Sequence, residues 1–475
     1  MTKTPIKFGT DGWRAIIAED YTFENVRDCA EGVARYLSDA GLADRGLIIG
    51  FDTRFGSEDF AAASAEVVAG HGIKAYLFES AAATPVACHA ILDKRAGGAI
   101  VITASHNPAT YNGFKYKPEY AGSSPPEVVD ALEAAIEAGR AAGGPRRMTF
   151  EAAVQQGAIE RFDPRPAYDA HVARLVDLDR LRSTGVHVVF DAMHATGAGV
   201  LARLLDRGTT QIVELRAERN PAFPGMAAPE PIGRNLVPLM ETVVNSGAEI
   251  GLATDGDADR LGVVDEKGHF VDQHQTYALL CYYLLEHRGM RAPIVRSLTS
   301  TRMIDKLGDL YGVPVHETPV GFKYLGPKMM EIGAMAAGEE SGGYAIAEHL
   351  PERDGCFTGL LMLDLLARSG RTMSQLVEDL YAKVGQHFYD RIDVHVAPDQ
   401  RQAAIARVAE AKPGALAGRR VLSQDTLDGF RFELDGGWVL IRPSGTEPLL
   451  RIYTEMTDPA QVKPILEAAR ELAGV

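Results

Sequence analysis

Three carboxylates stand at alternate positions of the segment DGDADR, which begins at Asp255. Together with Asp257 and Asp259, this residue can bind one hard cation if the backbone curls around it. A solvated acidic turn is disfavoured because three like charges this close repel one another. An EF-hand loop would also use these positions, with Glu266 as its last ligand, but Arg260 replaces the glycine that such a loop requires. Apolar segments on both sides favour a Mg²⁺ site at a strand end, with coordination room for a phosphate oxygen.

A serine follows a short apolar run at residues 99–102, within the sequence TASHNP of residues 103–108. The run predicts a buried strand, and the small polar residues and proline predict a loop after it. Ser105 would then be held on a rigid edge with its hydroxyl facing outward. The alternative is an ordinary strand-end turn, where serine and asparagine are common. Lys115 lies close enough in sequence to share this site, and it could act as a general base if neighbours lower its pKa.

Three further glycine-containing loops carry polar or basic side chains. Residues 338–343 (GEESGG) offer two acids and a hydroxyl that can exchange hydrogen bonds with vicinal sugar hydroxyls. Residues 442–448 (RPSGTEP), with Arg451 beyond them, can form a phosphate cradle from an arginine, two hydroxyls and a turn. Residues 8–14 form a glycine-rich turn that ends on Arg14. For each loop the alternative is a plain surface turn.

Short apolar strands alternate with longer helical patterns and must position these loops. A weak repeat supports this view, because a glycine, a short apolar strand and a polar loop recur at residues 97–102, 247–253 and 333–337. Each copy follows another predicted strand, at residues 47–52, 188–191 and 293–296, with helical sequence such as 58–70 in between. The alternation predicts α/β units with largely parallel sheets. Three related domains would each offer a loop at the carboxyl end of a strand, where open sheets bind ligands. The alternative is that any strand of an α/β protein shows this pattern, in which case the three segments need not be related.

The predicted domains are bounded by linker-like stretches at residues 141–147, near Asp265 and near Gln386. From Val396 the composition changes, and alternating strands at residues 429–434 and 438–442 surround a hairpin turn. We therefore predict α/β domains at residues 1–150, 151–265 and 266–386, followed by a smaller α+β domain at residues 387–475.

Composition limits the class of protein. The chain has 475 residues, 46% hydrophobic and 24% charged, with a formal net charge of −15. This negative charge argues against nucleic-acid binding. It would also repel an anionic substrate, which would therefore need local basic loops to bind. The four cysteines are far apart and suggest neither disulfides nor a zinc site. The N-terminus shows no hydrophobic leader and no segment is long and apolar enough to span a membrane, so we expect a cytoplasmic location.

With these loops in this order, the chain resembles the α-D-phosphohexomutase superfamily, and within it the phosphoglucomutase type most. The resemblance covers essentially the whole chain. It implies an α/β fold of three related domains with mixed, largely parallel sheets, plus the C-terminal domain, around a central cleft. It also implies an intramolecular phosphotransferase of the isomerase class that uses Mg²⁺.

The resemblance implies a role for residues in each loop. Ser105 would carry a phosphoryl group and complete the shell of Mg²⁺ held by Asp255, Asp257 and Asp259. The catalytic groups would be Ser105, His106, Lys115, Arg14 and Arg260, with Lys115 transferring protons. Glu339 and Ser341 would bind sugar hydroxyls, and Thr318, Gly321 and Lys323 would also bind the substrate. Arg353 resembles a basic residue that contacts phosphate in phosphoglucomutases. The non-reacting phosphate would be bound by Arg442, Ser444, Gly445, Thr446 and Arg451.

The implied reaction interconverts glucose 1-phosphate and glucose 6-phosphate through glucose 1,6-bisphosphate. Relatives that also use mannose usually carry a bulky apolar residue at the position of Glu340 and a histidine at that of Gly343. The alternatives are such a bifunctional phosphomannomutase/phosphoglucomutase, a sugar-phosphate hydrolase and a non-catalytic binder. One departure is Asp11, where many relatives have serine. We expect a hexose phosphate as partner, no nucleic acid or membrane, and a monomer or homodimer.

Overall fold

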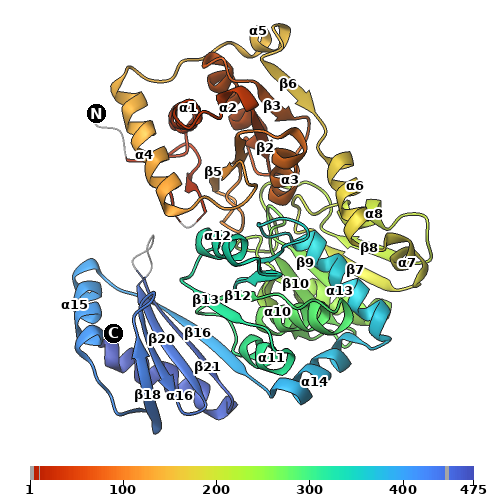
Figure 1. Ribbon diagram of the computed structural model, residues 1–475, viewed down its shortest axis with the longest axis vertical. Coiled ribbons are helices and arrows are strands. Elements are labelled where there is room, and N and C mark those ends of the chain that lie inside the picture. Colours follow the sequence, from red (N-terminus) through yellow and green to blue (C-terminus); the bar gives the residue numbers. More distant parts are fainter. Residues whose placement is uncertain (1–4, 10, 444–448) are drawn as a thin grey trace.

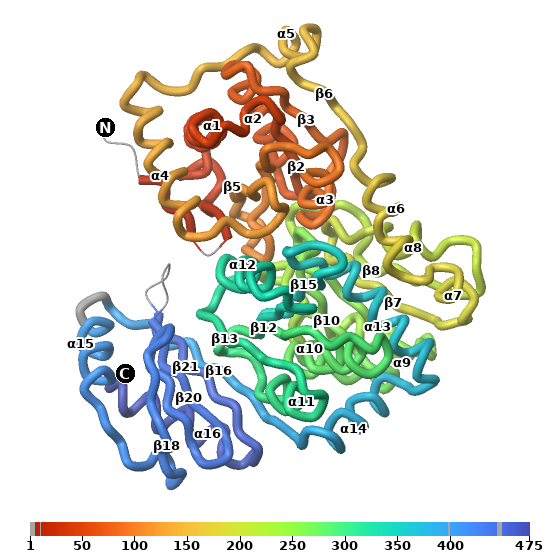
Figure 2. The backbone as a smooth tube through the Cα atoms, in the orientation of Figure 1, coloured from red at the N-terminus to blue at the C-terminus, as the bar shows by residue number. Residues whose placement is uncertain are grey.

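The computed structural model describes residues 5–9, 11–443 and 449–475, and these form four sheets with their helices (Figure 1). The chain builds them in sequence order, from the first unit, in red and orange, to the last, in blue (Figure 2). The first three units share one large hydrophobic core, and the fourth has its own. Among the described residues, no helix combines the length and apolar composition needed to cross a membrane.

The first sheet has the strand order β1-β5-β4-β2-β3-β6. Its strands are β1 (Trp13–Ile16), β2 (Leu47–Phe51), β3 (Ala75–Phe78), β4 (Gly98–Ile102), β5 (Tyr111–Pro118) and β6 (Ile159–Phe162). Its helices are α1 (Phe23–Asp39), α2 (Ser57–Gly70), α3 (Thr84–Lys94), α4 (Pro126–Ala141) and α5 (Phe150–Gln155), with a 3₁₀ turn η1 (Ala43–Arg45). Strands β4, β2, β3 and β6 are parallel, and β5 is antiparallel to both of its neighbours.

The second sheet has the order β11-β10-β9-β7-β8. Its strands are β7 (His187–Asp191), β8 (Gln211–Leu215), β9 (Ile250–Thr254), β10 (Leu261–Asp265) and β11 (Phe270–Val271). The helical segments before and around it are α6 (Arg165–Leu175), α7 (Leu178–Ser183), α8 (Val200–Leu204), η2 (Gly233–Asn235) and α9 (Val237–Ser246).

The third sheet has the order β13-β12-β14-β15. Its strands are β12 (Ile294–Ser297), β13 (Val315–Thr318), β14 (Ala336–Gly338) and β15 (Tyr344–Ile346). Its helices are α10 (Gln273–Tyr282), continued by the π-helical turn η3 (Tyr283–His287), then α11 (Met303–Tyr311), α12 (Phe322–Ile332), α13 (Gly355–Ser369) and α14 (Met373–Val384).

The fourth sheet is antiparallel throughout, with the order β16-β21-β20-β19-β18-β17. Its strands are β16 (Phe388–His395), β17 (Ala415–Leu416), β18 (Arg419–Asp425), β19 (Phe430–Leu434), β20 (Gly437–Pro443) and β21 (Leu449–Met456). Its helices are α15 (Pro398–Glu410) and α16 (Pro459–Ala473). The predicted hairpin is confirmed as β19 and β20.

The predicted repeat corresponds to one strand arrangement that occurs in each of the first three sheets. A central strand (β4, β9 or β14) pairs in parallel with the strand two places earlier in the chain (β2, β7 or β12) and antiparallel with the next strand (β5, β10 or β15). The central and preceding strands in the first sheet are apolar and buried along their whole length, as expected of strands covered on both faces. The fold class of three α/β units and a C-terminal domain is therefore confirmed.

Two strands lie beyond the predicted domain boundaries. Strand β6 follows residue 150 but pairs with β3 in the first sheet, and β11 follows residue 265 but pairs with β10 in the second. The first two sheets thus each include a strand from beyond the boundary that composition suggests, because an edge strand joins a sheet by pairing with a strand that is distant in sequence. The exact division into domains stays a prediction. All four cysteines are buried and free, as expected of reduced thiols.

Candidate active site

The three loops singled out in the sequence occupy the same place in the three related sheets. Ser105 lies between β4 and β5, the acidic segment between β9 and β10, and the GEESGG segment between β14 and β15. Each loop therefore joins the central strand to its antiparallel partner at that strand's carboxyl end. This shared position brings chemically different side chains from three units toward one place.

Ser105 is almost completely buried and contacts the acidic segment directly. Its Oγ donates a hydrogen bond to Asp255 Oδ2 at 2.8 Å and lies 3.3 Å from His106 Nδ1. The two loops approach so closely that a Cβ on Gly256 would lie 2.2 Å from the Ser105 carbonyl oxygen. Only glycine fits at that position, because any side chain would force the loops apart.

The acidic triad has the composition and the unmet bonding capacity of a cation site. One carboxylate oxygen from each of Asp255, Asp257 and Asp259 lies within 4.8 Å of the others, and all three residues are buried. The loop curls as predicted, since Asp255 Oδ1 accepts hydrogen bonds from the backbone of Asp259 and Arg260 at 3.0 and 3.2 Å. Among the described residues, Asp257 Oδ1 and Asp259 Oδ1 are buried without a hydrogen-bond partner. Hard oxygen donors left unpaired in a buried site fit a divalent cation such as Mg²⁺.

The electrostatics of the triad also favour a cation. Burial and the charges of Asp259 and Asp257 raise the pKa of Asp255 well above its usual range. Burial likewise raises the pKa of Asp259, although Arg353 opposes this. For Asp257, burial is outweighed by Lys115 and Thr84, which hold its pKa below the usual range. A bound cation would relieve the repulsion that makes ionisation of this group of acids costly.

Basic side chains surround Ser105. Arg14 donates to Asn107 Oδ1 at 2.8 Å, in the serine loop, and Arg260 donates to Glu230 Oε1 at 3.1 Å. Burial and the charges of Arg260 and Arg14 lower the pKa of His106 well below its ordinary value. The imidazole of His106 is therefore neutral near pH 7. The structure thus brings together the residues predicted to lie around a transferring phosphoryl group.

Lys115 is held by three carboxylates, which corrects one expectation. Its Nζ lies 2.7 Å from Asp11 Oδ2, 2.8 Å from Asp257 Oδ2 and 3.4 Å from Asp259 Oδ2. Burial alone would lower the pKa of Lys115, but the three carboxylates outweigh it and raise the pKa. The condition under which Lys115 could act as a general base, a pKa lowered by its neighbours, is therefore not met in this arrangement. Asp11, where many relatives carry serine, supplies one of the three negative charges.

Three residues missed by sequence reasoning complete a buried ionic cluster. Lys117 Nζ lies 2.7 Å from Glu352 Oε2 and 2.9 Å from Asp11 Oδ1, and Ser123 also donates to Glu352 Oε2, at 2.8 Å. The pattern does contain a signal for Lys117, because residues two apart on β5 share one face of the strand with Lys115. The cluster joins the first unit to the third.

Arg353 fills the space beside Gly343. A Cβ on Gly343 would lie 2.3 Å from Arg353 Cδ, so the arginine stem takes the room that a side chain there would need. The guanidinium lies 2.6 Å from Asp11 Oδ2, 2.8 Å from Asp259 Oδ2 and 3.6 Å from Glu339 Oε2. The predicted phosphate-binding role of Arg353 stays a prediction, and in this structure the guanidinium contacts carboxylates from all three α/β units.

The GEESGG loop presents acids and a hydroxyl toward this cluster. Glu339 is buried, and burial raises its pKa to about 7 although Arg353 opposes the shift. The Ser341 hydroxyl oxygen is buried without a hydrogen-bond partner among the described residues. Glu340 accepts a hydrogen bond from Ser297 at 3.1 Å. Glu339 and Ser341 thus have capacity left for a polar ligand.

The predicted distal-phosphate residues lie where the third and fourth units meet. Asp428 accepts a hydrogen bond from the Val320 backbone at 2.9 Å and lies 2.9 Å from Arg442 Nε. It therefore links the arginine to the segment that holds Thr318, which is buried, and Gly321, which adopts a φ of 123°. The remaining members of the predicted set are placed as follows: Lys323 lies over the Tyr324 ring, Arg451 lies 3.9 Å from Asp393, and Ser444, Gly445 and Thr446 lie outside the described residues.

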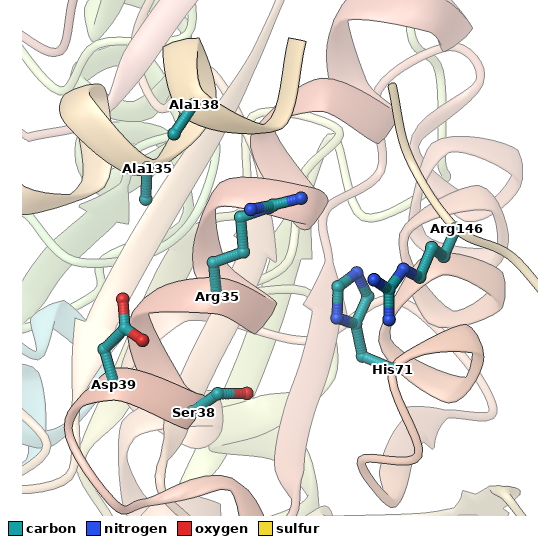
Figure 3. Close-up of a pocket in the computed structure, with 7 residues that line it drawn as sticks. All are labelled: Arg35, Ser38, Asp39, His71, Ala135, Ala138 and Arg146. Carbon is teal, nitrogen blue, oxygen red and sulfur yellow. The ribbon is translucent and has the colours of Figure 1, made fainter. Parts of the chain in front are cut away.

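A separate pocket of about 250 Å³ lies on the first unit, between α1, α4 and the end of α2 (Figure 3). Arg35 and His71 border it, and both pair with the buried Glu31, at 2.7 and 2.6 Å. Because His71 follows α2 and precedes β3, the pocket is at the amino ends of the parallel strands. It is therefore on the opposite edge of the sheet from the serine loop.

Models of all four domains of one family match this chain in order. The phosphoglucomutase/phosphomannomutase α/β/α domains I, II and III match residues 5–142, 166–268 and 272–384, and the C-terminal domain matches residues 393–472. The phosphoglucomutase/phosphomannomutase of Thermococcus kodakarensis is 30% identical over 466 residues, which cover 98% of each chain. The phosphoglucosamine mutase of Streptomyces avermitilis is 30% identical over 472 residues, 98% of this chain and 97% of the relative. A crystal structure from Thermus thermophilus, assigned as a phosphomannomutase, covers 100% of both chains with a TM-score of 0.86 and 34% identity.

The fold and these matches define an intramolecular phosphotransferase of the isomerase class, a phosphohexomutase. The chain belongs to the phosphoglucomutase/phosphomannomutase family. Its relatives are named for glucose, mannose and glucosamine phosphates at similar identity, so relatedness alone does not select the sugar.

Proposed function

We propose that this protein interconverts α-D-glucose 1-phosphate and glucose 6-phosphate, with Ser105 as phosphoryl carrier and glucose 1,6-bisphosphate as intermediate. The observation that carries the proposal is the 2.8 Å contact between the Ser105 hydroxyl and Asp255, within a buried group of unpaired carboxylate oxygens and basic side chains. A phosphoryl group on this hydroxyl would place an oxygen beside the triad. Mg²⁺ held by Asp255, Asp257 and Asp259 would neutralise negative charge on that group.

The transfer step requires a balanced exchange of bonds and one proton. A sugar hydroxyl forms a bond to the phosphorus of phosphorylated Ser105 as the bond from Ser105 Oγ to phosphorus breaks. The sugar hydroxyl loses a proton and Ser105 Oγ gains one. We assign this exchange to two groups: the protonated amine of Lys115 would donate to Ser105 Oγ, and the neutral His106 imidazole, 3.3 Å from Ser105 Oγ, would accept the proton of the sugar hydroxyl. Arg14 and Arg260 would stabilise the negative charge spread over the transferring group.

The other loops suit the remaining parts of the substrate. Glu339 and Ser341 would bind sugar hydroxyls, as their free bonding capacity allows. Arg442 and Arg451, with residues 444–446, would bind the phosphate that does not react. The same set must hold either phosphate, because the bisphosphate has to turn over before the second transfer.

Glucose is favoured over mannose by two residues of the third unit. Glu340 and Gly343 differ from the bulky residue and histidine usual in the bifunctional type, and the stem of Arg353 takes the space beside Gly343. The bifunctional phosphomannomutase/phosphoglucomutase is the second candidate. Comparing kcat/KM for glucose 1-phosphate and mannose 1-phosphate separates them, and a ratio near one would reject the glucose assignment.

A coupled assay tests the reaction itself. With glucose 1-phosphate, Mg²⁺ and a trace of glucose 1,6-bisphosphate, we expect steady formation of glucose 6-phosphate. Ser105→Ala should lower kcat at least about 10⁴-fold, because it removes the phosphoryl carrier. Ser64→Ala is the matched control, since Ser64 is also buried but donates to a helix carbonyl in α2. Release of free phosphate would instead indicate a hydrolase, and no turnover a binding protein. The cytoplasmic location and the oligomeric state stay predictions.

A further inference from the structure

The backbone at Ser105 adopts a conformation that serine does not favour. Its φ is 49°, in the left-handed region that L residues other than glycine rarely adopt. Such a conformation persists only where surrounding contacts hold it in place. The contacts that hold Ser105 therefore determine where its hydroxyl lies relative to the acidic triad.

Arg54 binds the backbone of Ser105 and of the loop that follows it. Its Nη2 donates to the carbonyl oxygens of Ser105 and Asn107, both at 2.6 Å. Its Nη1 donates to the carbonyl oxygens of Pro108 and Tyr111, at 2.8 and 3.0 Å. One guanidinium thus binds four carbonyls across the whole loop between β4 and β5. These contacts leave only the Nε–H of its five donors for another partner.

The guanidinium is itself held firmly and is fully buried. Its Nε lies 3.3 Å from Asp52 Oδ2, in the same unit. From the second unit, the Phe223 ring lies against it at 5.0 Å, and Arg219 donates to the carbonyl oxygens of Thr53 and Arg54 at 3.0 and 3.3 Å. Arg54 therefore couples the serine loop to the unit that carries the acidic triad.

The direction of these hydrogen bonds has an electrostatic consequence. Each of the four carbonyl oxygens carries partial negative charge, and each points toward Arg54 instead of toward the Ser105 hydroxyl, which faces Asp255. Carbonyls turned toward the hydroxyl would repel a transferring phosphoryl group. Arg54 makes no contact with the hydroxyl, so it can act only through the shape of the loop.

We propose that Arg54 is a positioning residue for phosphoryl transfer: it holds the loop of residues 105–111 so that the Ser105 hydroxyl faces the triad. The inference rests on the proposed function of Ser105 as phosphoryl carrier. Lysine cannot replace arginine here, because its three donors on one nitrogen cannot span four carbonyls in the way that a planar fork does.

The test is Arg54→Lys, which keeps the charge and removes the fork. We expect kcat to fall about 30- to 100-fold while KM for glucose 1-phosphate changes less than about threefold, because misplacing the reacting group slows chemistry without touching the sugar and distal-phosphate loops. Phosphorylation of Ser105 by glucose 1,6-bisphosphate in a single turnover, followed by mass spectrometry, should slow by the same factor.

Arg296→Lys is the matched control, since Arg296 is equally buried but pairs with Asp305 and Glu317, away from the serine loop. It should lower the melting temperature to a similar degree and leave kcat within about threefold of the parent. The proposal is overturned if Arg54→Lys also keeps kcat within about threefold, if both variants lose kcat equally, or if KM rises in place of the fall in kcat.

A second variant decides the matter if Arg54→Lys does not fold. Asp52→Asn weakens the anchor of the guanidinium at nearly constant volume, and it should lower kcat about 5- to 10-fold at unchanged KM. An unchanged kcat in Asp52→Asn overturns the proposal. Failure of the proposed function is recognised separately: the parent shows no mutase activity, or Ser105→Ala retains it, and the inference on Arg54 then fails with it. The inference fails alone when the parent is active, Ser105→Ala is inactive and Arg54→Lys keeps its kcat.

Discussion

The third unit meets the first and the fourth unit through ion pairs that differ in exposure. Toward the first unit, Lys117 and Glu352 pair with side chains that are both 0% exposed. Toward the fourth unit, Arg302 and Glu433 pair with side chains that are 28% and 27% exposed, and Glu317 pairs with Arg431 with side chains that are 19% and 9% exposed. The first junction surrounds the reacting end of the candidate site, and Glu433 of the second pairs with Trp438 at the start of β20.

The exposure of an ion pair affects how easily the two units that it joins can separate. A buried ion pair is costly to separate because each charge would be left in a poorly solvated place. A partly exposed pair can be separated at little cost because water replaces the partner. The pair at the reacting end is therefore costly to separate, whereas the Arg302–Glu433 pair at the junction with the fourth unit separates at lower cost. This suits a reaction in which a bisphosphate must turn over between two transfers.

The largest expected effect is at the reacting end. Asp257→Asn removes a charge from the triad and should lower kcat/KM about 10²- to 10³-fold. It should also raise the Mg²⁺ concentration needed for half-maximal activity. Asp265→Asn is the control, because Asp265 is buried at the end of β10 but binds only turn amides and His269. An unchanged Mg²⁺ titration in Asp257→Asn would reject the metal assignment.

The next effect concerns stability at the buried junction. Lys117→Met leaves Glu352 and Asp11 without their shared cation, and it should lower the free energy of unfolding by about 3–5 kcal/mol. Chemical denaturation at pH 7.5 measures this. Lys74→Met, which breaks a pair whose side chains are 35% and 45% exposed, should cost less than about 1 kcal/mol. Equal losses in the two variants would contradict the expected difference between buried and partly exposed ion pairs.

A pH-dependent effect is expected at Glu339. Burial raises its pKa from 4.5 to about 7, so the native state holds a proton that the unfolded state has lost. The stability that Glu339 contributes below pH 4.5 is therefore lost as the pH rises to about 7. Glu339→Gln, which stays neutral, should gain about 3 kcal/mol of unfolding free energy relative to the parent between pH 4.5 and pH 8. A constant difference between the two proteins across this range would refute the assigned shift.

The smallest effect is expected at the junction with the fourth unit. A double-mutant cycle of Arg302→Ala and Glu433→Ala should give a coupling energy of about 0.2–1 kcal/mol, and it should shrink with added salt. Denaturation of the four proteins at low and high salt measures it. A coupling above about 2 kcal/mol would show that this junction is as firmly held as the other.

Much of the fold could be predicted because its signals are local. A run of apolar residues that ends in a polar loop indicates a buried strand and marks its carboxyl end. Three such runs predicted the three related units. The local pattern does not reveal that β6 and β11 belong to the first and second sheets. An edge strand joins a sheet by pairing with a partner that is distant in sequence, which short-range patterns do not show. Lys115 shows the equivalent limit for electrostatics, because its pKa depends on Asp11 and Asp257 from other segments.

The sequence by itself determined the chemical inventory: a serine on a strand-end loop, three alternating carboxylates, a polar glycine-rich loop and a basic loop. Only the tertiary structure decided how they act on one another. It placed Ser105 against Asp255, turned four loop carbonyls toward Arg54, and joined Asp11 to Arg353 across 342 positions of the chain. The physical reason is that strand and loop formation depend on neighbouring residues. Burial, ion pairing and pKa depend instead on groups that packing brings together from separate units.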